Sequence, residues 1–327
     1  MSAAPIDTGR ILRDLDELWV NLGKDEHGGA GSDGVLRACS MTLVVCTEGH
    51  DAELGETLAL LMRDHPSRLI VVNLSESAAA LTASVTAECW MPFGRKQQIC
   101  CERIAIEIPE HAIGDAPSVA RGLIAPDLPV AVWCRSRRLL HHPEFRTVVR
   151  LANKLIVDSS DIEDLAGRIA TLRAFRDADT RVADLAWTRL TRWREAIAAI
   201  FDDPDYLAHL DAMDRVVLEY QGPHRPMSTC YLPAWLAHCL GRRFETRWYR
   251  AGDSPRPRLF RVALHGTSLD VAIKVEADRS VQMHTGTRDS HCVFPALGEY
   301  DLMREELAIG GEDPVFEAVL NLAPEFA

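Results

Sequence analysis

The spacing of apolar residues changes several times along the chain, and each change predicts an element of the fold. Within residues 1–22, Ile11, Leu15 and Leu18 recur at helical spacing, which predicts an N-terminal helix. Residues 23–34 contain five glycines and few apolar residues, so they predict a flexible linker. With such a linker, the helix is free to pack either on its own chain or on a partner.

A first folded domain is expected at residues 35–180. The runs 36–47 and 68–74 are almost continuously apolar, as in strands buried on both faces, and residues 53–64 between them have a helical pattern. This order predicts a β-α-β unit with parallel strands. Two β-rich runs around the turn sequence 91–96 predict an added antiparallel hairpin. Further helices and strands of this domain are expected at 118–124, 130–134, 144–153, 155–157 and 162–177.

A second domain is expected at residues 181–327. It begins with a helical pattern at 182–201. A strand, a helix, a run of strands and two C-terminal helices follow, at 215–220, 229–240, 244–250, 259–264, 268–276, 280–285, 299–308 and 314–322. The chain is therefore predicted to be a two-domain α/β protein. A mostly parallel sheet with an inserted hairpin comes first, and a mixed α/β domain with an antiparallel meander comes second.

The start of the second domain holds two tryptophans and three arginines within the segment Asp184–Glu195. Tryptophan and arginine dominate the energetics of protein interfaces. Trp187, Arg189, Arg192 and Trp193 are therefore candidates for contact with a partner protein. The alternative is that both tryptophans fill the core and that Arg189, which falls inside the apolar stripe, pairs with a carboxylate or reaches water along its stem.

Six ordered blocks of sequence carry a resemblance to a known family: Arg37–Val45, His65–Arg68, Gln97–Glu102, Pro126–Pro129, Asp184–Glu195 and Asp313–Glu317. Together they resemble the glucose-6-phosphate dehydrogenase assembly protein family, OpcA, from about residue 15 to about residue 320. The resemblance implies a non-catalytic partner that binds the dehydrogenase of the oxidative pentose phosphate pathway and raises its activity.

Arg68 and Trp133 are further candidates for contact with the dehydrogenase. Arg68 lies at the start of a buried strand, at the end of the sheet opposite the usual ligand crevice of an open α/β fold. An ion pair that anchors the start of this strand is favoured there over binding of a phosphate.

Nine cysteines are scattered through the chain without a Cys-x-x-Cys pair, which predicts reduced thiols. A turn centred on Phe93 and Gly94 would place Cys89 diagonal to Cys100 on one face of the hairpin, with Cys101 on the other face. A diagonal separation of roughly 7–8 Å is long for a disulfide. A redox switch that involves Cys89, Cys100 or Cys101 is therefore a minor hypothesis.

The net charge of −12 opposes long-range attraction to nucleic acid. The longest apolar runs are far shorter than the ~20 residues of a membrane span, and the N-terminus has no secretory pattern, so a cytoplasmic protein is expected. Two short basic stretches, 135–138 and 242–250, would suit a phosphorylated ligand or an acidic patch on a partner, although such stretches are more often simply solvated.

The sequence contains neither glycine-rich phosphate-binding pattern of nucleotide enzymes, and its twelve histidines have no metal-ligand spacing. No catalytic residues, cofactor or metal are therefore predicted. Two alternatives to an activator stay open. One is an enzyme or sensor that binds a sugar phosphate through residues 135–138, and the other is a structural subunit that only stabilises the dehydrogenase oligomer.

Overall fold

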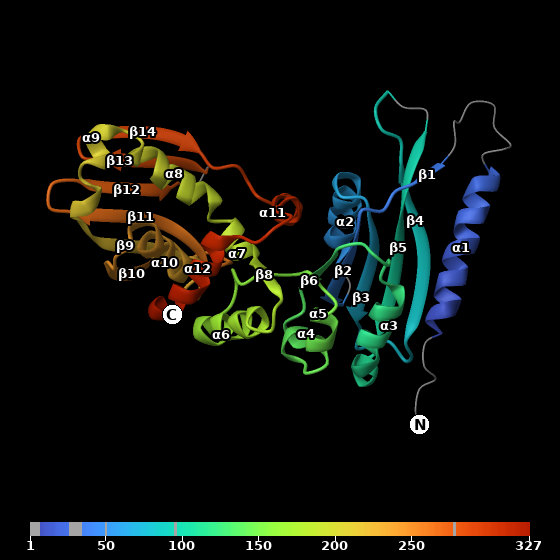
Figure 1. Ribbon diagram of the computed structural model, residues 1–327. Helices are drawn as coiled ribbons and strands as arrows, with labels where there is room; N and C mark the ends of the chain where they lie inside the picture. The colour runs from blue at the N-terminus through green and yellow to red at the C-terminus, as the bar shows by residue number, and fades with distance from the viewer. Residues whose placement is uncertain (1–6, 26–34, 50, 95–96, 277–278) are drawn as a thin grey trace. The chain divides into compact units, whose positions relative to one another are not determined.

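The computed structural model describes residues 7–25, 35–49, 51–94, 97–276 and 279–327. The chain folds into two compact units. Unit 1 comprises residues 1–157 and 179–182, and unit 2 comprises residues 158–178 and 183–327. Figure 1 labels most of the helices and strands of both units.

Unit 1 is built on a mostly parallel sheet, sheet A, with the strand order β1-β5-β3-β2-β6-β7-β8 and with β4 paired to β5. The last two residues of β8 are counted with unit 2. The strands are β1 (Val35–Arg37), β2 (Met41–Glu48), β3 (Ser67–Leu74), β4 (Thr82–Trp90), β5 (Gln98–Ile108), β6 (Val130–Cys134), β7 (Lys154–Val157) and β8 (Arg181–Asp184). The predicted β-α-β unit is confirmed, because β2 and β3 are parallel and α2 (Ala52–Asp64) connects them. The predicted antiparallel hairpin is confirmed as β4–β5.

Helices cover both faces of sheet A. Cys101 and Glu102 are neighbours on β5 and therefore point to opposite faces. The Cys101 thiol donates to the carbonyl of Met62 in α2, whereas Glu102 bonds to α1 (Thr8–Asp25). Accordingly, α1 and α2 lie on opposite sides of the β4–β5 region (Figure 1). The other helices of unit 1 are η2 (Glu110–Asp115), α3 (Ala116–Leu123), α4 (Arg137–His141) and α5 (Phe145–Val149).

The N-terminal helix ends three residues later than predicted. It extends through Asp25, so it includes the first residues of the glycine-rich stretch. Residues 26–34 of the predicted linker lie outside the described residues.

Unit 2 contains a separate mixed sheet, sheet B, with the order β10-β9-β11-β12-β13-β14. Its strands are β9 (Met213–Gln221), β10 (Glu245–Gly252), β11 (Arg258–Gly266), β12 (Asp270–Val275), β13 (Ser280–Thr285) and β14 (Arg288–Val293). The predicted antiparallel meander is confirmed from β11 to β13, and β14 continues it. β10 instead pairs in parallel with β9, at the edge of the sheet.

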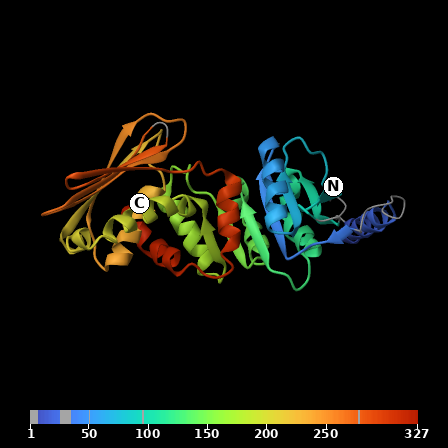
Figure 2. The same cartoon turned by 90° about the horizontal axis from the view of Figure 1, so that it is seen from above.

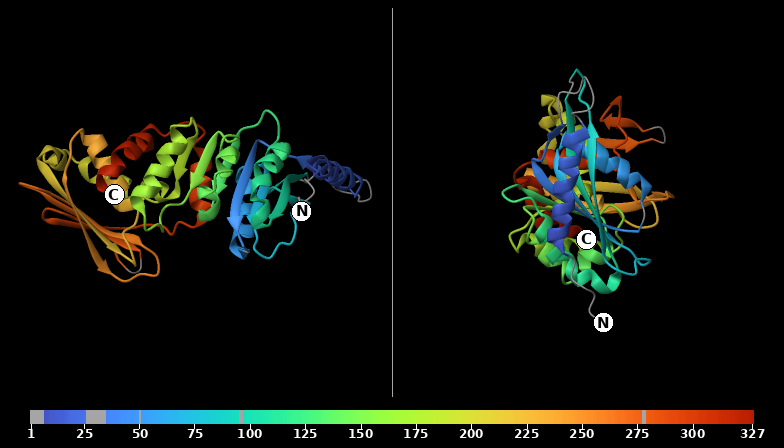
Figure 3. Two further views of the ribbon diagram at one scale, coloured as in Figure 1. Left: turned by 90° about the horizontal axis from the view of Figure 1, so that it is seen from below. Right: turned by 90° about the vertical axis from the view of Figure 1, so that its right-hand side faces the viewer.

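The helices of unit 2 gather on one face of sheet B (Figures 2 and 3). They are α6 (Leu165–Arg176), α7 (Leu185–Thr188), α8 (Thr191–Phe201), α9 (Pro204–Leu207), η3 (Leu210–Ala212), α10 (Ser228–Leu240), α11 (Glu299–Ala308), α12 (Pro314–Leu322) and η4 (Ala323–Phe326). Within the described residues, no helix is both long enough and apolar enough to cross a membrane.

The single helix predicted at 182–201 is wrong. Residues 181–184 form β8, and two shorter helices, α7 and α8, follow. Asp184 is the reason for the break: its backbone is extended, and its carboxylate accepts a hydrogen bond from the Ala186 amide at the start of α7. An N-cap residue of this kind begins a helix and cannot lie inside one.

Candidate functional site

In unit 1, the buried carboxylate of Glu102 connects three of the six sequence blocks that carry the resemblance, namely those that contain Arg37, Arg68 and Glu102 itself. It is 1% exposed and accepts a hydrogen bond of 2.6 Å from Nε of Arg68, and it also pairs with Arg37. The indole of Trp19 in α1 donates to its other oxygen at 3.0 Å, and the Arg37 guanidinium lies 5.1 Å from the centre of the Trp19 ring. Arg68 also donates to the carbonyl of Leu123, at the end of α3. The cluster therefore ties α1 and α3 to sheet A.

The Glu102 cluster shows where the N-terminal helix packs and which residue pairs with Arg68. The N-terminal helix packs on its own chain, because Trp19 bonds to Glu102 of β5. The expected ion pair at the start of the Arg68 strand is confirmed, since Arg68 is buried and paired with Glu102. Both guanidinium bonds of Arg68 point into unit 1, so Arg68 serves the fold and is not presented to a partner.

In unit 2, Trp187 connects two further blocks, Asp184–Glu195 and Asp313–Glu317. Its indole donates to the Asp313 carboxylate at 2.9 Å, and the other Asp313 oxygen caps the first turn of α12. The ring stacks on Phe316 at a centroid distance of 5.6 Å, and the guanidinium of Arg194 lies 3.6 Å from the ring centre. Trp187 is buried and holds α12 to the start of the unit.

Unit 2 contains a buried carboxylate, Asp184, which accepts hydrogen bonds from the amides of Ser159 and Ala186 and from the hydroxyl of Tyr231. Burial raises the pKa of Asp184, and the nearby negative charge of Asp158 adds to this effect. Burial would also raise the pKa of Asp158, but the charge and hydrogen bond of Arg189 outweigh it and leave that pKa below its usual range. Two neighbouring carboxylates thus have opposite pKa shifts, because Arg189 outweighs burial for Asp158 whereas burial dominates for Asp184.

The structure therefore separates the six candidates for partner contact into two groups. Trp187, Trp193, Trp133 and Arg68 are buried, and this favours the alternative in which the aromatic residues of the Asp184–Glu195 segment fill the core. Arg189 pairs with Asp158 at 2.8 Å and is partly exposed, and Arg192 pairs with Glu195 at the surface. Of the six candidates, only these two arginines present charge to solvent.

The usual ligand crevice of an open α/β sheet lies where the strand order reverses, here at the carboxyl ends of β2 and β6. In this protein, the crevice contains the chain's own carboxylates. Glu48 accepts hydrogen bonds from the Ser136 hydroxyl and the Arg138 amide, and Asp51 accepts bonds from two amides at the start of α2. A phosphate would need those same donors.

The cations of the same crevice are also engaged. Arg135 donates to Asp51 at 2.8 Å, and Arg138 bonds to Glu76 and Glu110. The hydrogen bond from Arg135 holds the pKa of the Asp51 carboxyl below its usual range, so Asp51 is a carboxylate at neutral pH. A sugar phosphate would have to displace these pairs in order to bind the basic stretch 135–138.

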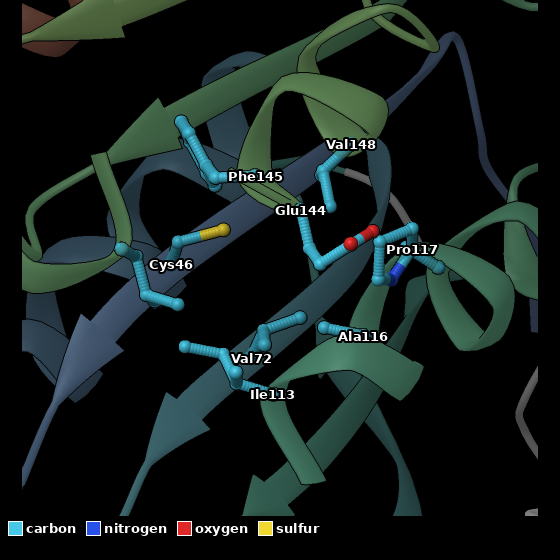
Figure 4. A pocket seen from close by; sticks show the side chains of 10 residues that line it. Cys46, Val72, Ile113, Ala116, Pro117, Glu144, Phe145 and Val148 are labelled. Carbon is cyan, nitrogen blue, oxygen red and sulfur yellow. The ribbon is translucent and has the colours of Figure 1, made fainter. Parts of the chain in front are cut away.

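A narrow pocket lies between sheet A and the helices of unit 1 (Figure 4). Glu144 is its one charged lining residue, and burial raises the pKa of the Cys46 thiol to about 12, so this thiol stays protonated. The lining residues are Cys46, Val72, Ile113, Ala116, Pro117, Ala120, Leu139, Glu144, Phe145 and Val148. Ligand sites use several convergent polar groups to orient a ligand, and this lining does not provide them. In the described part of the chain, no three His, Cys, Asp or Glu side chains are grouped to hold a metal ion.

The cysteines of the hairpin differ from the sequence prediction. Cys89 lies directly opposite Cys100, with 4.1 Å between their Cα atoms, and the two form a disulfide. The predicted diagonal arrangement is wrong because Trp90 pairs with Ile99, which moves the centre of the turn one residue past the predicted position. The prediction of reduced thiols is likewise wrong for this pair. Cys101 lies on the other face as expected, and burial raises its thiol pKa to about 11.

Sequence analysis missed the acceptors of these buried contacts. Glu102, Asp184 and Asp313 hold the clusters together, yet none was a candidate. One signal was present for Glu102, since it ends one of the six ordered blocks and Arg68 was expected to pair with a carboxylate.

Comparisons with known proteins match both halves of the chain. Residues 59–174 match the family described as the glucose-6-phosphate dehydrogenase subunit N-terminal domain, and residues 180–320 match the corresponding C-terminal domain. The OxPP cycle protein OpcA of Nostoc punctiforme is 27% identical over 239 residues, which is 72% of this chain and 48% of that protein. Its counterpart from Synechocystis sp. is 26% identical over 213 residues, 64% of this chain and 42% of that protein. The chain thus matches less than half the length of these relatives.

Solved structures with similarity to the chain include two oxidoreductases. Biliverdin reductase from Synechocystis sp. PCC 6803 has a TM-score of 0.48 at 10% identity, over 87% of this chain and 96% of the other. Aldose-aldose oxidoreductase from Caulobacter crescentus has a TM-score of 0.47 at 12% identity, over 86% and 94%.

The two family matches follow one another in order and cover most of the chain, and both buried clusters are built from the blocks that carried the resemblance. The chain belongs to the glucose-6-phosphate dehydrogenase assembly protein family, OpcA.

Proposed function

We propose that this protein is a non-catalytic assembly factor and allosteric activator that binds glucose-6-phosphate dehydrogenase and supports the oxidative pentose phosphate pathway. Family membership supports the choice of partner. The observation that carries the non-catalytic role is the crevice of sheet A, where Glu48 and Asp51 occupy the donors that a nucleotide or sugar phosphate would use. We therefore assign catalysis to the dehydrogenase, and this chain acts by binding to it.

Activation by a partner requires differential binding. The protein must bind the competent conformation or oligomer of the dehydrogenase more tightly than the other form, typically with ~1–3 kcal/mol of coupling. If the competent form is also the one with higher affinity for glucose 6-phosphate, reciprocity requires the substrate to tighten the complex between the two proteins.

Among the contacts suggested by sequence, Arg189 and Arg192 are retained as candidates because both reach solvent. Trp187, Trp193, Trp133 and Arg68 are assigned to the fold because they are buried. Under this assignment, substitutions of the buried group weaken activation only by destabilising the protein.

The test is a titration of the purified dehydrogenase with the purified protein, in which the KM for glucose 6-phosphate and the kcat are both measured. The proposal expects a saturable rise in kcat/KM. It also expects the affinity between the proteins to increase when substrate is present. Equal affinity with and without substrate contradicts coupling to substrate binding and leaves either a scaffold or an activator that raises kcat alone.

A scaffold and an activator also differ in their effect on the enzyme's mass. A subunit that only stabilises the dehydrogenase oligomer shifts the mass distribution of the enzyme and leaves the KM of the assembled oligomer unchanged. An activator changes the KM or the kcat at constant oligomeric state. Analytical ultracentrifugation alongside the kinetic titration separates the two.

A further inference from the structure

Strand β10 forms one edge of sheet B in unit 2. It pairs with β9 on one side, and no strand of the described chain pairs with its other side. Six of its eight residues are exposed. The backbone N–H and C=O groups on the outer side of an edge strand are available to an additional strand from another protein.

The edge presents two aromatic side chains. Trp248 is 40% exposed and Tyr249 is 51% exposed, and as neighbours on a strand they point to opposite faces of sheet B. Arg225 lies over the Trp248 ring with its guanidinium 4.3 Å from the centre. Large aromatic side chains that stand half-exposed and braced in this way are typical anchors of protein interfaces.

Arginines flank the aromatic residues on the same strand. Arg247 and Arg250 are about half-exposed, and Nε of Arg250 donates to the carbonyl of Gly222 at 2.8 Å, which fixes its position. Alternation along the strand places Arg247 on the face of Tyr249 and Arg250 on the face of Trp248. Each face of the edge therefore offers one aromatic ring and one guanidinium.

The charge of this region is opposite to that of the whole chain. Residues 242–258 contain six arginines and two acidic residues, a net charge of +4, whereas the chain carries −12. The carboxylates that pair with Arg247 and Arg250 belong to Glu245 and Asp253, which are themselves exposed. Exposed pairs contribute little to stability, so a partner's carboxylates can replace them at small cost.

Charge disfavours a second copy of the chain at this edge in the register that pairs its aromatic residues. In an antiparallel pairing that places Trp248 of one copy opposite Tyr249 of the other, Arg247 lies directly opposite Arg250. Like charges at directly opposite positions of a sheet are destabilising. Charged residues on an edge strand oppose pairing of this kind, but protection from self-association does not call for an exposed tryptophan and tyrosine beside the charges.

We infer that the edge of β10 is a docking surface for an extended, acidic segment of the dehydrogenase, held by Trp248, Tyr249, Arg247 and Arg250. This inference rests on the proposed function, because it names the surface through which that partner is bound. The segment adds a strand to sheet B and places alternate carboxylates near Arg247 on one face and near Arg250 on the other. Affinity through this surface should fall as the salt concentration rises.

The test compares charge-reversal variants at the two edges of the same sheet. R247E and R250E change β10, and R288E makes the same change in charge on the exposed strand β14 at the opposite edge. Affinity for the purified dehydrogenase is measured at low and high salt, and thermal unfolding confirms that each variant is folded. R247E and R250E are expected to bind about tenfold or more weakly and to lose part of the salt dependence, while R288E stays within about twofold of the wild type.

The measurements distinguish failure of the docking surface from failure of the proposed function. If the wild type does not bind the dehydrogenase, the proposed function fails and this surface falls with it. If the wild type binds and R247E, R250E and Y249A bind equally well, the docking surface is wrong while the proposed function stands.

A photo-crosslinking amino acid in place of Tyr249 identifies the occupant independently of any loss of affinity. The inference expects an adduct with an acidic segment of the dehydrogenase, located by mass spectrometry. An adduct with a second copy of this chain, or labelling of the dehydrogenase only when the crosslinker replaces Arg288, overturns it.

Discussion

Replacing Glu102 with alanine should strongly destabilise unit 1. The carboxylate is buried, and it is the acceptor for Arg68, Arg37 and the Trp19 indole. Removing one partner of a buried ion pair typically costs about 3–5 kcal/mol, because the other charge stays buried and unpaired. Arg37 is partly exposed and can be hydrated, and Arg68 keeps its bond to the Leu123 carbonyl, so the lower end of about 3 kcal/mol applies.

For a unit of this size, about 3 kcal/mol corresponds to a fall of roughly 6–12 °C in the melting temperature. Differential scanning calorimetry measures this change, and hydrogen exchange shows whether α1 loses protection because the Trp19 bond is gone. E107A is the matched control, since Glu107 lies on the same strand but is only half-buried and accepts a hydrogen bond from Asn73. Equal shifts for E102A and E107A, with α1 still protected, would refute the account of the Glu102 cluster.

Three further predictions follow from the buried clusters and the hairpin. W187F removes the hydrogen bond to Asp313, and urea denaturation should show a loss of about 1–3 kcal/mol in unit 2; a change below about 0.5 kcal/mol would mean that Trp187 contributes only its apolar surface. Burial raises the pKa of Asp184, so the free energy of unfolding should fall as the pH rises through that pKa. The variant D184N cannot titrate at this position and should lose this part of the pH dependence. Parallel pH profiles for the wild type and D184N would contradict the assignment. Mass spectrometry of alkylated, denatured protein should count seven free thiols before reduction and nine after it, and nine thiols in both samples would exclude the Cys89–Cys100 bond in solution.

Apolar pattern was sufficient to predict the main architecture from the sequence. Apolar runs identified β3 and β6 as buried strands, and the helical pattern before β3 predicted its parallel pairing with β2. These elements are specified locally, because burial on both faces requires apolar residues at every position. The single strand predicted at 36–47 is wrong in its extent, because the range forms two strands, β1 and β2, and β1 pairs with β5. The pattern is weakest where a strand is exposed. β14 was missed for this reason, since Arg288–Val293 is mostly polar and its only strand neighbour in sheet B is β13.

The roles of the conspicuous residues were harder to predict, because they depend on contacts between distant parts of the chain. Composition suggested an interface at Trp187, but its partner Asp313 lies 126 residues away in sequence and turns the residue into a core contact. The hairpin register depended on the position of one turn, and a shift of one residue in its centre placed Cys89 opposite Cys100. The exposure of Trp248 and Tyr249 was not predicted from the sequence, because it follows from the position of β10 at the sheet edge.

The central claim is that this chain acts on metabolism through binding to another protein. The most direct measurement is an assay of glucose 6-phosphate oxidation in three samples: the chain alone, the dehydrogenase alone, and the dehydrogenase titrated with the chain. The account predicts no turnover by the chain alone and a saturable rise in the kcat/KM of the dehydrogenase. Turnover by the chain alone, or an unchanged kcat/KM at concentrations that saturate binding, would contradict it.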